Sequence, residues 1–193
     1  MMAAPSLLES RLAPPRPTDD ALYEVVNGQS VELPPMGAYA GWIASRLDQR
    51  LGPFAEKGRL GTVVTEVLMI PDSERNLRRR PDVAFVSAER WPFNRQVPEV
   101  GDWEVVPDLA VEIISPNDLF ADVLSRMHEY FENGVRQVWI VVPMKQQVYV
   151  FASPTQVRIL TAAEELDGGD LLPGFRLPIA HLFLRQTEGT TPA

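Results

Sequence analysis

Apolar and polar positions between Trp103 and Pro143 follow three successive patterns. The first is an apolar strand, residues 109–113, which carries one carboxylate, Glu112, between a valine and an isoleucine. Apolar residues on both faces are typical of a strand in the middle of a helix-covered sheet. An ionised carboxylate is costly in such a place unless a cation, hydrogen-bond donors or water meets it. Glu112 is therefore the first candidate functional residue.

The second pattern predicts an amphipathic helix, and the third a second strand. Apolar residues recur at three- and four-residue spacing on one helical stripe: Phe120, Val123, Leu124, Met127, Tyr130 and Phe131. Asn117 or Asp118 is expected to cap this helix, and Gly134 to end it. Val135–Val142 then predicts another buried strand. The whole segment predicts a right-handed crossover between parallel strands.

The rest of the chain adds a hairpin, a helix and further strands. Leu22–Val26 and Val31–Leu33, joined through Asn27 and Gly28, predict a β-hairpin. An apolar stripe in Met36–Leu51, followed by Gly52 and Pro53, predicts a helix that stops there. The other expectations are strands at 62–70, 82–86, 147–151 and 157–160, a turn at 72–76, a loop at 90–101 and a wrap over the core at 171–183.

Length and composition indicate one mixed α/β domain. The chain has 193 residues, enough for a sizeable core, and we expect the domain to span 21–184 between loose tails at 1–20 and 185–193. The absence of cysteine excludes disulfides and thiol chemistry. No apolar run approaches a membrane span, and the first 20 residues lack the pattern of a secretory signal. A cytoplasmic protein without a membrane partner is expected.

The net charge argues against nucleic-acid binding, whereas the local distribution of arginines argues for it. The net charge of −8 opposes phosphate binding, which draws on concentrated lysine and arginine. Arg78, Arg79 and Arg80 nevertheless crowd just ahead of Asp82. They predict a local basic rim that binds nucleic acid, although an exposed arginine-rich turn explains them equally well.

Spacing decides which acid can share a cation with Glu112. Asp108 precedes it by four residues on the same strand, so their Cα atoms are about 13 Å apart at about 3.3 Å per residue. One ion with oxygen ligands at about 2.0–2.6 Å cannot bridge that distance. Asp82 begins a different strand, and neighbouring strands lie about 4.8 Å apart. If those two strands pair, Asp82 and Glu112 can hold a hard cation together, whereas Asp108 is better explained as a strand-entry residue.

A set of motifs in this order resembles a known family. The motifs are YEVVNGQ, RRPDVAFVS, PDLAVEIISPND, an Asp-x3-Arg-x3-Tyr helix, GVRQVWIVVP and LPGFRLP. Together they resemble the Uma-type putative restriction endonuclease family of the PD-(D/E)XK nuclease superfamily, over roughly residues 20 to 185. The combination is far more specific than any single motif.

The resemblance implies a restriction-endonuclease-like core, with a mixed sheet flanked by helices and a divalent-metal site. Asp82 and Glu112 match the two acids of the motif, and the backbone carbonyl of Ile113 would be a further ligand. Such a site would hold Mg²⁺ or Mn²⁺ and cleave DNA. Glu24 is a weaker candidate for an additional acid. The resemblance also makes a homodimer plausible, since paired subunits can cut two strands.

Two positions depart from the family pattern, and a third departs from the pattern of the superfamily. The superfamily's lysine position, two residues after the second acid, is Ile114 here. The family's alternative lysine on the following helix corresponds to Arg126, which keeps the charge but cannot shed a proton as a general base. The family's common aspartate before Pro143 is Val142. These departures leave open a second reading, a catalytically inactive nuclease fold that binds nucleic acid or protein.

Each candidate residue also has an ordinary structural explanation. Asp82 and Glu112 could be polar strand ends, and Asp122 and Arg126 could be a surface pair at helical spacing. His128 and His181 lack metal-ligand spacing and are expected to be structural. The four tryptophans are expected to pack in or beside the core: Trp42, Trp91, Trp103 and Trp139. No glycine-rich phosphate loop or nucleophile elbow is present.

Overall fold

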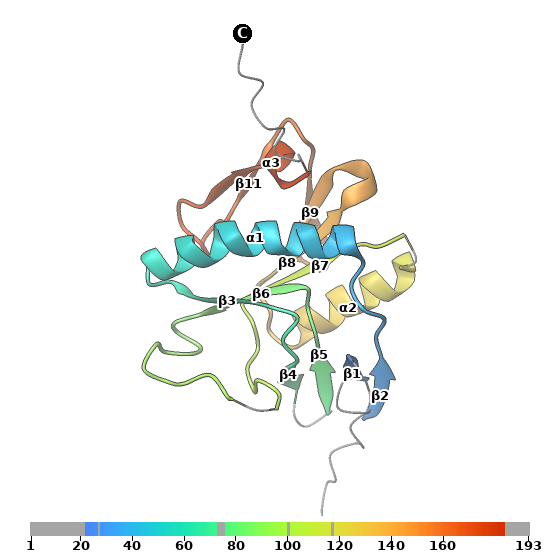
Figure 1. Cartoon of the computed structure of the whole chain (residues 1–193), viewed down its shortest axis with the longest axis vertical. Coiled ribbons are helices and arrows are strands. Elements are labelled where there is room, and N and C mark those ends of the chain that lie inside the picture. The colour runs from blue at the N-terminus through green and yellow to red at the C-terminus, as the bar shows by residue number, and fades with distance from the viewer. Residues whose placement is uncertain (1–21, 27, 73–75, 100, 117, 184–193) are drawn as a thin grey trace, which may run out of the picture.

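A mixed sheet forms the centre of the molecule (Figure 1). The computed structural model describes residues 22–26, 28–72, 76–99, 101–116 and 118–183. The six-stranded sheet has the order β10-β9-β8-β7-β6-β3. Its strands are β3 (Gly61–Thr65), β6 (Val83–Ser87), β7 (Leu109–Ile113), β8 (Gln137–Val142), β9 (Gln147–Ser153) and β10 (Gln156–Leu160).

The parallel strand–helix–strand connection predicted for the central segment is confirmed. β7 and β8 pair in parallel, with Leu109 opposite Gln137, and α2 (Phe120–Glu132) connects them. Gly134, just after this helix, has φ +87°, the left-handed conformation expected at a helix end. The capping prediction is wrong for Asp118, because its carboxylate accepts the Ser115 N–H and α2 has no side-chain cap. Asn117 lies outside the described residues.

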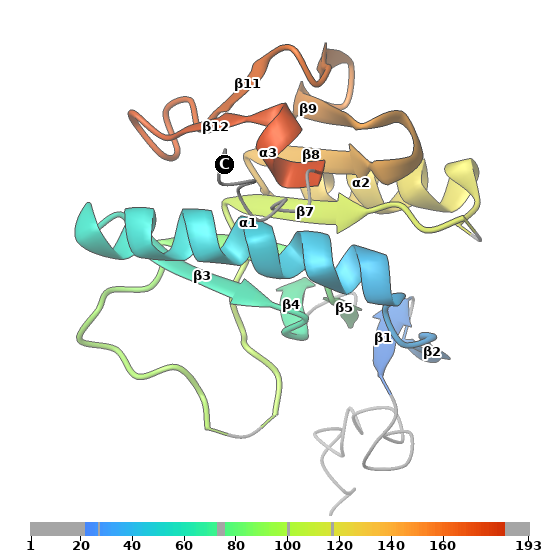
Figure 2. The same cartoon turned by 45° about the horizontal axis from the view of Figure 1, so that its top comes forward.

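Phe120 departs from the predicted apolar stripe of α2. Val123, Met127 and Tyr130 of that stripe are buried, but Phe120 is 75% exposed. The helix begins beyond the carboxyl end of β7 (Figure 2), so its first turn has no sheet beneath it. The spacing of apolar residues therefore predicted the buried face of α2 correctly. It did not show that the first turn of the helix extends beyond the core.

The first long helix, α1 (Ala38–Lys57), continues past its predicted stop. Gly52 and Pro53 lie inside it, and the helix ends only at Gly58. The buried stripe extends through Leu51 to Ala55, and packing of this stripe outweighs the loss of the one backbone donor that a proline removes.

A smaller sheet, of order β2-β1-β5-β4, lies beside the main one. The predicted hairpin is confirmed: β1 (Tyr23–Val26) and β2 (Gln29–Glu32) pair with Val26 opposite Gln29. The single strand predicted at 62–70 is wrong, because β3 ends at Thr65, Glu66 has φ +50° and β4 (Met69–Asp72) starts afresh. β5 (Leu77–Arg79) was not predicted, since its arginines indicated a surface turn. Of the turn predicted at 72–76, residues 73–75 fall outside the described part.

The meander β8-β9-β10 is confirmed, and the C-terminal segment covers the core as predicted. After a 3-10 helix at Pro143–Lys145 and the meander, the chain adds β11 (Glu165–Asp167), β12 (Arg176–Pro178) and α3 (Ile179–Phe183). Leu166, Leu177 and Ile179 pack in the same core as Ile43 and Leu47 of α1. Both predicted tails lie outside the described residues.

The two faces of the main sheet are covered by different helices (Figures 1 and 2). Leu109, Val111 and Ile113 of β7 belong to the core beneath α1. Ala110 belongs to the core beneath α2, with Met127 and others. Because successive side chains of a strand point to opposite faces, Glu112 is directed to the α2 side. Within the described residues, no helix is long and apolar enough to cross a membrane.

Candidate active site

Glu112 is buried and held by two residues of α2. It is 7% exposed, and the Tyr130 hydroxyl donates a hydrogen bond of 2.7 Å to its Oε1. Its Oε2 lies 3.4 Å from Nε of Arg126. Tyr130 and Arg126 are four residues apart, so they lie on one helical face, above the strand position that carries the carboxylate. In the sequence Tyr130 belonged to the apolar stripe and to the Asp-x3-Arg-x3-Tyr motif, and its contact with Glu112 was not foreseen.

Asp82 lies opposite Glu112 across two paired strands, as the spacing argument required. β6 and β7 are antiparallel, with Val83 opposite Val111, and one further step of this register brings Asp82 opposite Glu112. The Ile113 N–H donates a hydrogen bond of 2.6 Å to Asp82 Oδ2. The start of β6 and the end of β7 therefore place two carboxylates side by side at one end of these strands.

Asp108 has a structural role at the other end of β7. Its Oδ2 accepts the Ser87 N–H at 2.8 Å, and its Oδ1 lies 3.0 Å from Nε of Arg90 and 3.6 Å from a terminal nitrogen of Arg136. The Asp108 side chain is only 2% exposed. These contacts agree with its interpretation as a strand-entry residue.

Burial makes both acids of the candidate site reluctant to ionise. Burial raises the pKa of Glu112 to about 8, with Arg126 opposing the rise and Asp82 adding to it. Burial likewise raises the pKa of Asp82 to about 6, against the lowering effects of the Ile113 N–H and Arg126. The pKa of Tyr130 lies well above its ordinary value, chiefly through burial and the nearby Glu112, so its hydroxyl stays a donor. Burial and the proximity of the two carboxylates therefore disfavour the state in which both are ionised.

These shifts predict how stability depends on pH. Unfolded carboxyl groups titrate near 3.8 and 4.5, whereas the folded groups titrate near 6 and 8. Between these limits the folded state binds more protons than the unfolded state. The free energy of unfolding should therefore fall as the pH rises from about 4 to about 8, by ~1.4 kcal/mol per pH unit for each proton.

Urea unfolding with EDTA present checks this expectation. Glu112→Gln should flatten the curve between pH 6 and pH 8, where Glu112 is the main contributor. A wild-type stability that is flat or rises across this range would contradict the raised pKa of Glu112.

Glu24 enters the same site from the hairpin. Its Oε2 lies 2.6 Å from a terminal nitrogen of Arg79, and its Oε1 accepts the Arg80 N–H at 2.9 Å. Arg79 also donates from Nε to Glu129 of α2 at 2.8 Å. This buried arginine therefore joins β1, β5 and α2, and fixes Glu24 at the edge of the pocket.

The three arginines ahead of Asp82 do not form one exposed basic rim. Arg79 is 6% exposed and is neutralised by Glu24 and Glu129, so the expectation of a nucleic-acid contact is corrected for this residue. Arg78 is paired with Asp102 and largely buried. Arg80 donates to the Glu66 carbonyl and lines the candidate pocket. Of the three, only Arg80 faces the site.

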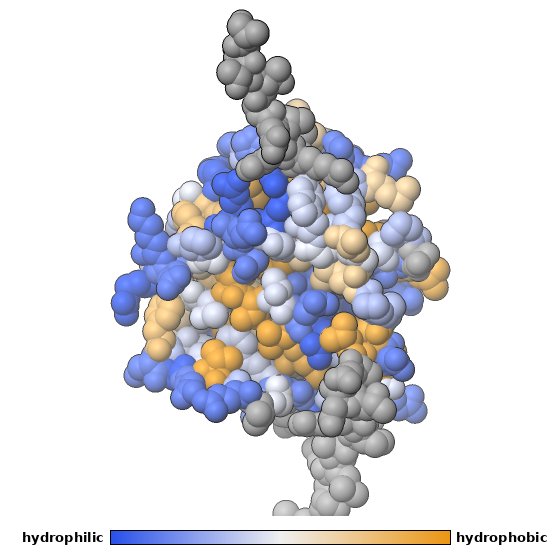
Figure 3. Space-filling model, in the orientation of Figure 1, coloured by the Kyte–Doolittle hydropathy of each residue, from blue (hydrophilic) through white to orange (hydrophobic). Residues whose placement is uncertain are grey.

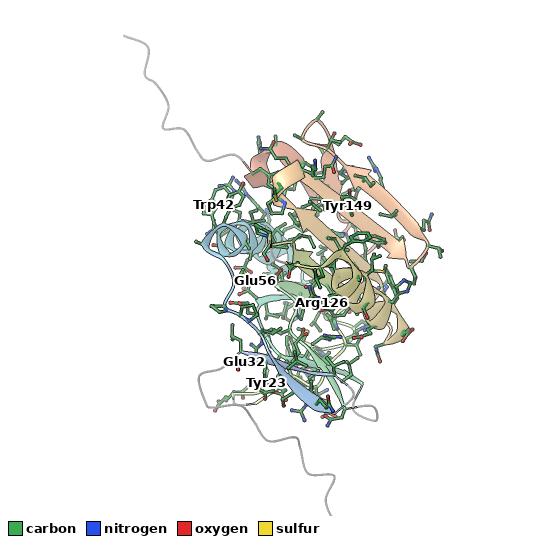
Figure 4. All side chains as sticks on the ribbon, turned by 90° about the vertical axis from the view of Figure 1, so that its right-hand side faces the viewer. Tyr23, Glu32, Trp42, Glu56, Arg126 and Tyr149 are labelled. Atoms are coloured by element: carbon green, nitrogen blue, oxygen red, sulfur yellow. The ribbon has the colours of Figure 1, made fainter. Side chains whose placement is uncertain are left out.

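The pocket between α1, the hairpin and the sheet brings these groups together. It encloses about 120 Å³, and five acids contribute to its lining: Glu24, Glu66, Asp82, Glu112 and Asp118. Arg80 and Arg126 supply its positive charge, and the N-terminal end of α1 forms another wall. Figure 3 shows hydrophilic surface bordered by hydrophobic surface between α1 and the hairpin. In Figure 4, Arg126 lies between α2 and the hairpin strands that carry Tyr23 and Glu32. Glu66 carried no recognisable sequence signal for this position, whereas Asp118 was expected as a helix cap and Arg80 as part of the basic rim.

The donor set suits a small hard cation that retains water ligands. Two carboxylates with raised pKa values face each other, and both are oxygen donors. Among the described residues, no group of three or more histidine, cysteine or carboxylate side chains is arranged to enclose an ion. Mg²⁺ commonly binds through one or two carboxylates and keeps several waters. The residues present therefore fit Mg²⁺ better than an ion that needs a cage of protein ligands.

Comparison with known proteins supports a nuclease relationship. The family model of Uma2, described as "Putative restriction endonuclease", matches residues 10–180. The chain belongs to the Uma2 family. A crystal structure of a putative nuclease belonging to DUF820 from Anabaena variabilis ATCC 29413 is similar, with a TM-score of 0.68 and 17% identity over 83% of this chain and 89% of that one. No functionally curated protein matches.

Membership of Uma2 confirms the resemblance seen in the sequence motifs, and the structural neighbour confirms the fold. The motif positions that defined the resemblance converge in space. Asp82, Glu112 and Arg126 come from β6, β7 and α2 and line one pocket. The departure from the family pattern at Arg126 is therefore located at the centre of the site.

Proposed function

We propose that this chain is a divalent-metal-dependent endonuclease that hydrolyses phosphodiester bonds of DNA. The observation that carries the proposal is the meeting of Asp82 and Glu112 across antiparallel strands, with Arg126 beside them in the same pocket. Buried acids with raised pKa values and defined charge partners are typical of functional sites.

Asp82, Glu112 and the carbonyl of Ile113 would hold Mg²⁺ or Mn²⁺. When bound, the metal supplies Lewis-acid stabilisation of the charge developing on the phosphate and favours deprotonation of the attacking water. Tyr130 holds Glu112 through one oxygen and leaves the other facing Arg126. The Ile113 N–H likewise holds Asp82 through one carboxylate oxygen, Oδ2.

Arg126 would stabilise negative charge on the scissile phosphate. Its Nε is buried without a hydrogen-bond partner among the described residues, although Glu112 Oε2 is 3.4 Å away. Burial lowers the pKa of Arg126, but Glu112 and Glu24 raise it by more, so the guanidinium stays charged. It can therefore donate to phosphate but cannot remove a proton from water.

The second candidate function is a catalytically inactive module that binds nucleic acid or protein. The observation that favours it is also Arg126, because an arginine against Glu112 already supplies one positive charge to the acids. A homodimer remains a prediction for either function.

Calorimetric titration with Mg²⁺ and Mn²⁺, followed by plasmid nicking, tests the endonuclease proposal. The wild type should bind metal and nick DNA, and both properties should disappear in Asp82→Ala and in Glu112→Ala. Glu165→Ala, an exposed acid on β11, is the matched control and should behave as the wild type. Absence of metal binding at millimolar concentration in the folded wild type would exclude catalysis by this site and favour the inactive module.

A further inference from the structure

One flank of α1 combines aromatic rings with positive charge in an otherwise acidic protein. At about 100° per residue, five side chains fall within an arc of about 80°. They are Tyr39, Trp42, Arg46, Arg50 and Lys57, named here the α1 stripe. The two acids of the helix, Asp48 and Glu56, lie outside this arc. The stripe extends for about 27 Å along the helix.

The aromatic end of the stripe is an ordered stack. The rings of Tyr39 and Trp42 lie 5.6 Å apart with an interplanar angle of 14°. The Arg46 guanidinium lies 4.7 Å above the Trp42 ring, and it is held there by hydrogen bonds to the His181 carbonyl. A carbonyl partner leaves the positive charge of Arg46 in place. In Figure 4, Trp42 lies on the outer side of α1.

The stripe begins next to the part of the chain that forms one wall of the candidate active site. Met36, Gly37 and Ala40 line the pocket, so Tyr39 stands between pocket residues at the start of α1. Tyr39 is 45% exposed, and of the two stacked rings it is the one whose sequence neighbours on both sides line the pocket. Farther along, Arg50 and Lys57 are exposed, and no ion pair joins either to an acid among the described residues.

We propose that the α1 stripe binds an unpaired nucleic-acid strand that enters or leaves the candidate active site. A base stacks on Tyr39, and Arg46, Arg50 and Lys57 follow the phosphates. Aromatic rings combined with a positively charged track are the usual means of binding single strands without sequence preference. Bases within a duplex offer no free face to such a ring, so the stripe favours a substrate with unpaired nucleotides beside the cleaved bond. The inference rests on the proposed function, because it takes the pocket as the place of cleavage.

Fluorescence anisotropy with a short fluorescein-labelled single-stranded DNA, with Ca²⁺ in place of Mg²⁺ to prevent cleavage, tests the stacking contact. Tyr39→Ala should bind about tenfold more weakly, as expected for the loss of one stacked base. Tyr39→Phe keeps the ring and should bind as the wild type. Phe93→Ala removes a ring of similar exposure, 47%, on the loop after β6, and should have no effect.

Salt dependence tests the charged part of the stripe. For a single strand, each lost phosphate contact reduces the slope of log K against log salt by about 0.7. The double variant with Arg50→Ala and Lys57→Ala should therefore lose about 1.4 from this slope. Arg158→Ala, an exposed arginine on β10, should leave the slope unchanged.

The outcomes separate this inference from the proposed function. If the wild type nicks DNA and Tyr39→Ala binds the single strand as tightly as the wild type, the stripe is overturned and the endonuclease stands. If the wild type binds the oligonucleotide, Tyr39→Ala weakens this binding and the wild type never cleaves DNA, the result supports the proposed role of the α1 stripe and contradicts the endonuclease proposal. A folded wild type that binds no oligonucleotide overturns the stripe.

Discussion

Arg126→Ala is expected to reduce plasmid nicking by about 10²- to 10³-fold, the usual effect of removing one donor to a charge that develops in the transition state. The same substitution should not weaken Mg²⁺ binding. Arg126 is a positive charge beside Glu112, and its removal leaves Asp82 and Glu112 more attractive to a cation. The variant should therefore bind Mg²⁺ more tightly and cut more slowly.

Calorimetry at a pH well above 8 measures the first effect, because the pKa of Glu112 is about 8 in the wild type and loss of Arg126 raises it further. Nicking rates measure the second effect. Arg126→Lys keeps the charge and should restore most of the activity lost in Arg126→Ala. Arg158→Ala removes an exposed arginine of β10 and controls for net charge. Loss of metal binding in a folded Arg126→Ala protein would show that the arginine helps to build the metal site, contrary to this expectation.

The two proline-aspartate pairs should respond to mutation in opposite ways. Asp108→Ala is expected to lower the free energy of unfolding by ~1–3 kcal/mol, because it leaves the part-buried Ser87 N–H without a partner and removes the carboxylate that pairs with Arg90 and Arg136. Asp82→Ala should abolish metal binding with a smaller loss of stability, because the cost of the freed Ile113 N–H is offset by removal of a buried carboxylate. Removal of an acid whose pKa is raised in the folded state relieves an unfavourable ionisation at neutral pH.

Urea unfolding and Mg²⁺ calorimetry on the two variants measure both properties. Folded Asp108→Ala should bind Mg²⁺ with the wild-type affinity. Asp82→Ala should unfold at a urea concentration closer to that of the wild type than Asp108→Ala does at neutral pH. A large loss of stability in Asp82→Ala, together with retained metal binding, would assign Asp82 a structural role and end its candidacy as a ligand.

The two acids of the candidate site could be predicted from the sequence, because they follow from residue type and spacing within the predicted strands. A carboxylate inside an apolar strand is unusual enough to identify Glu112 without any alignment. The distance along one strand excluded Asp108, and the distance between strands admitted Asp82. The partners of Glu112 were less accessible. Tyr130 read as part of an apolar stripe, and Arg79 read as part of a surface rim, because spacing along a helix or strand does not show which polar atom is buried against which.

The order of elements, the parallel crossover, the hairpin and the two strand ends that carry Asp82 and Glu112 were thus determined by the sequence itself, through local periodicity and turn chemistry. Tertiary structure decided what local pattern cannot encode. Packing of its buried face allows α1 to continue past Gly52 and Pro53. Phe120 is exposed because the sheet does not extend beneath it, and Arg79 is buried in an ion pair with Glu24, which is distant in the sequence. These outcomes depend on contacts between segments distant in the chain, whose energies exceed the local preferences that a sequence displays.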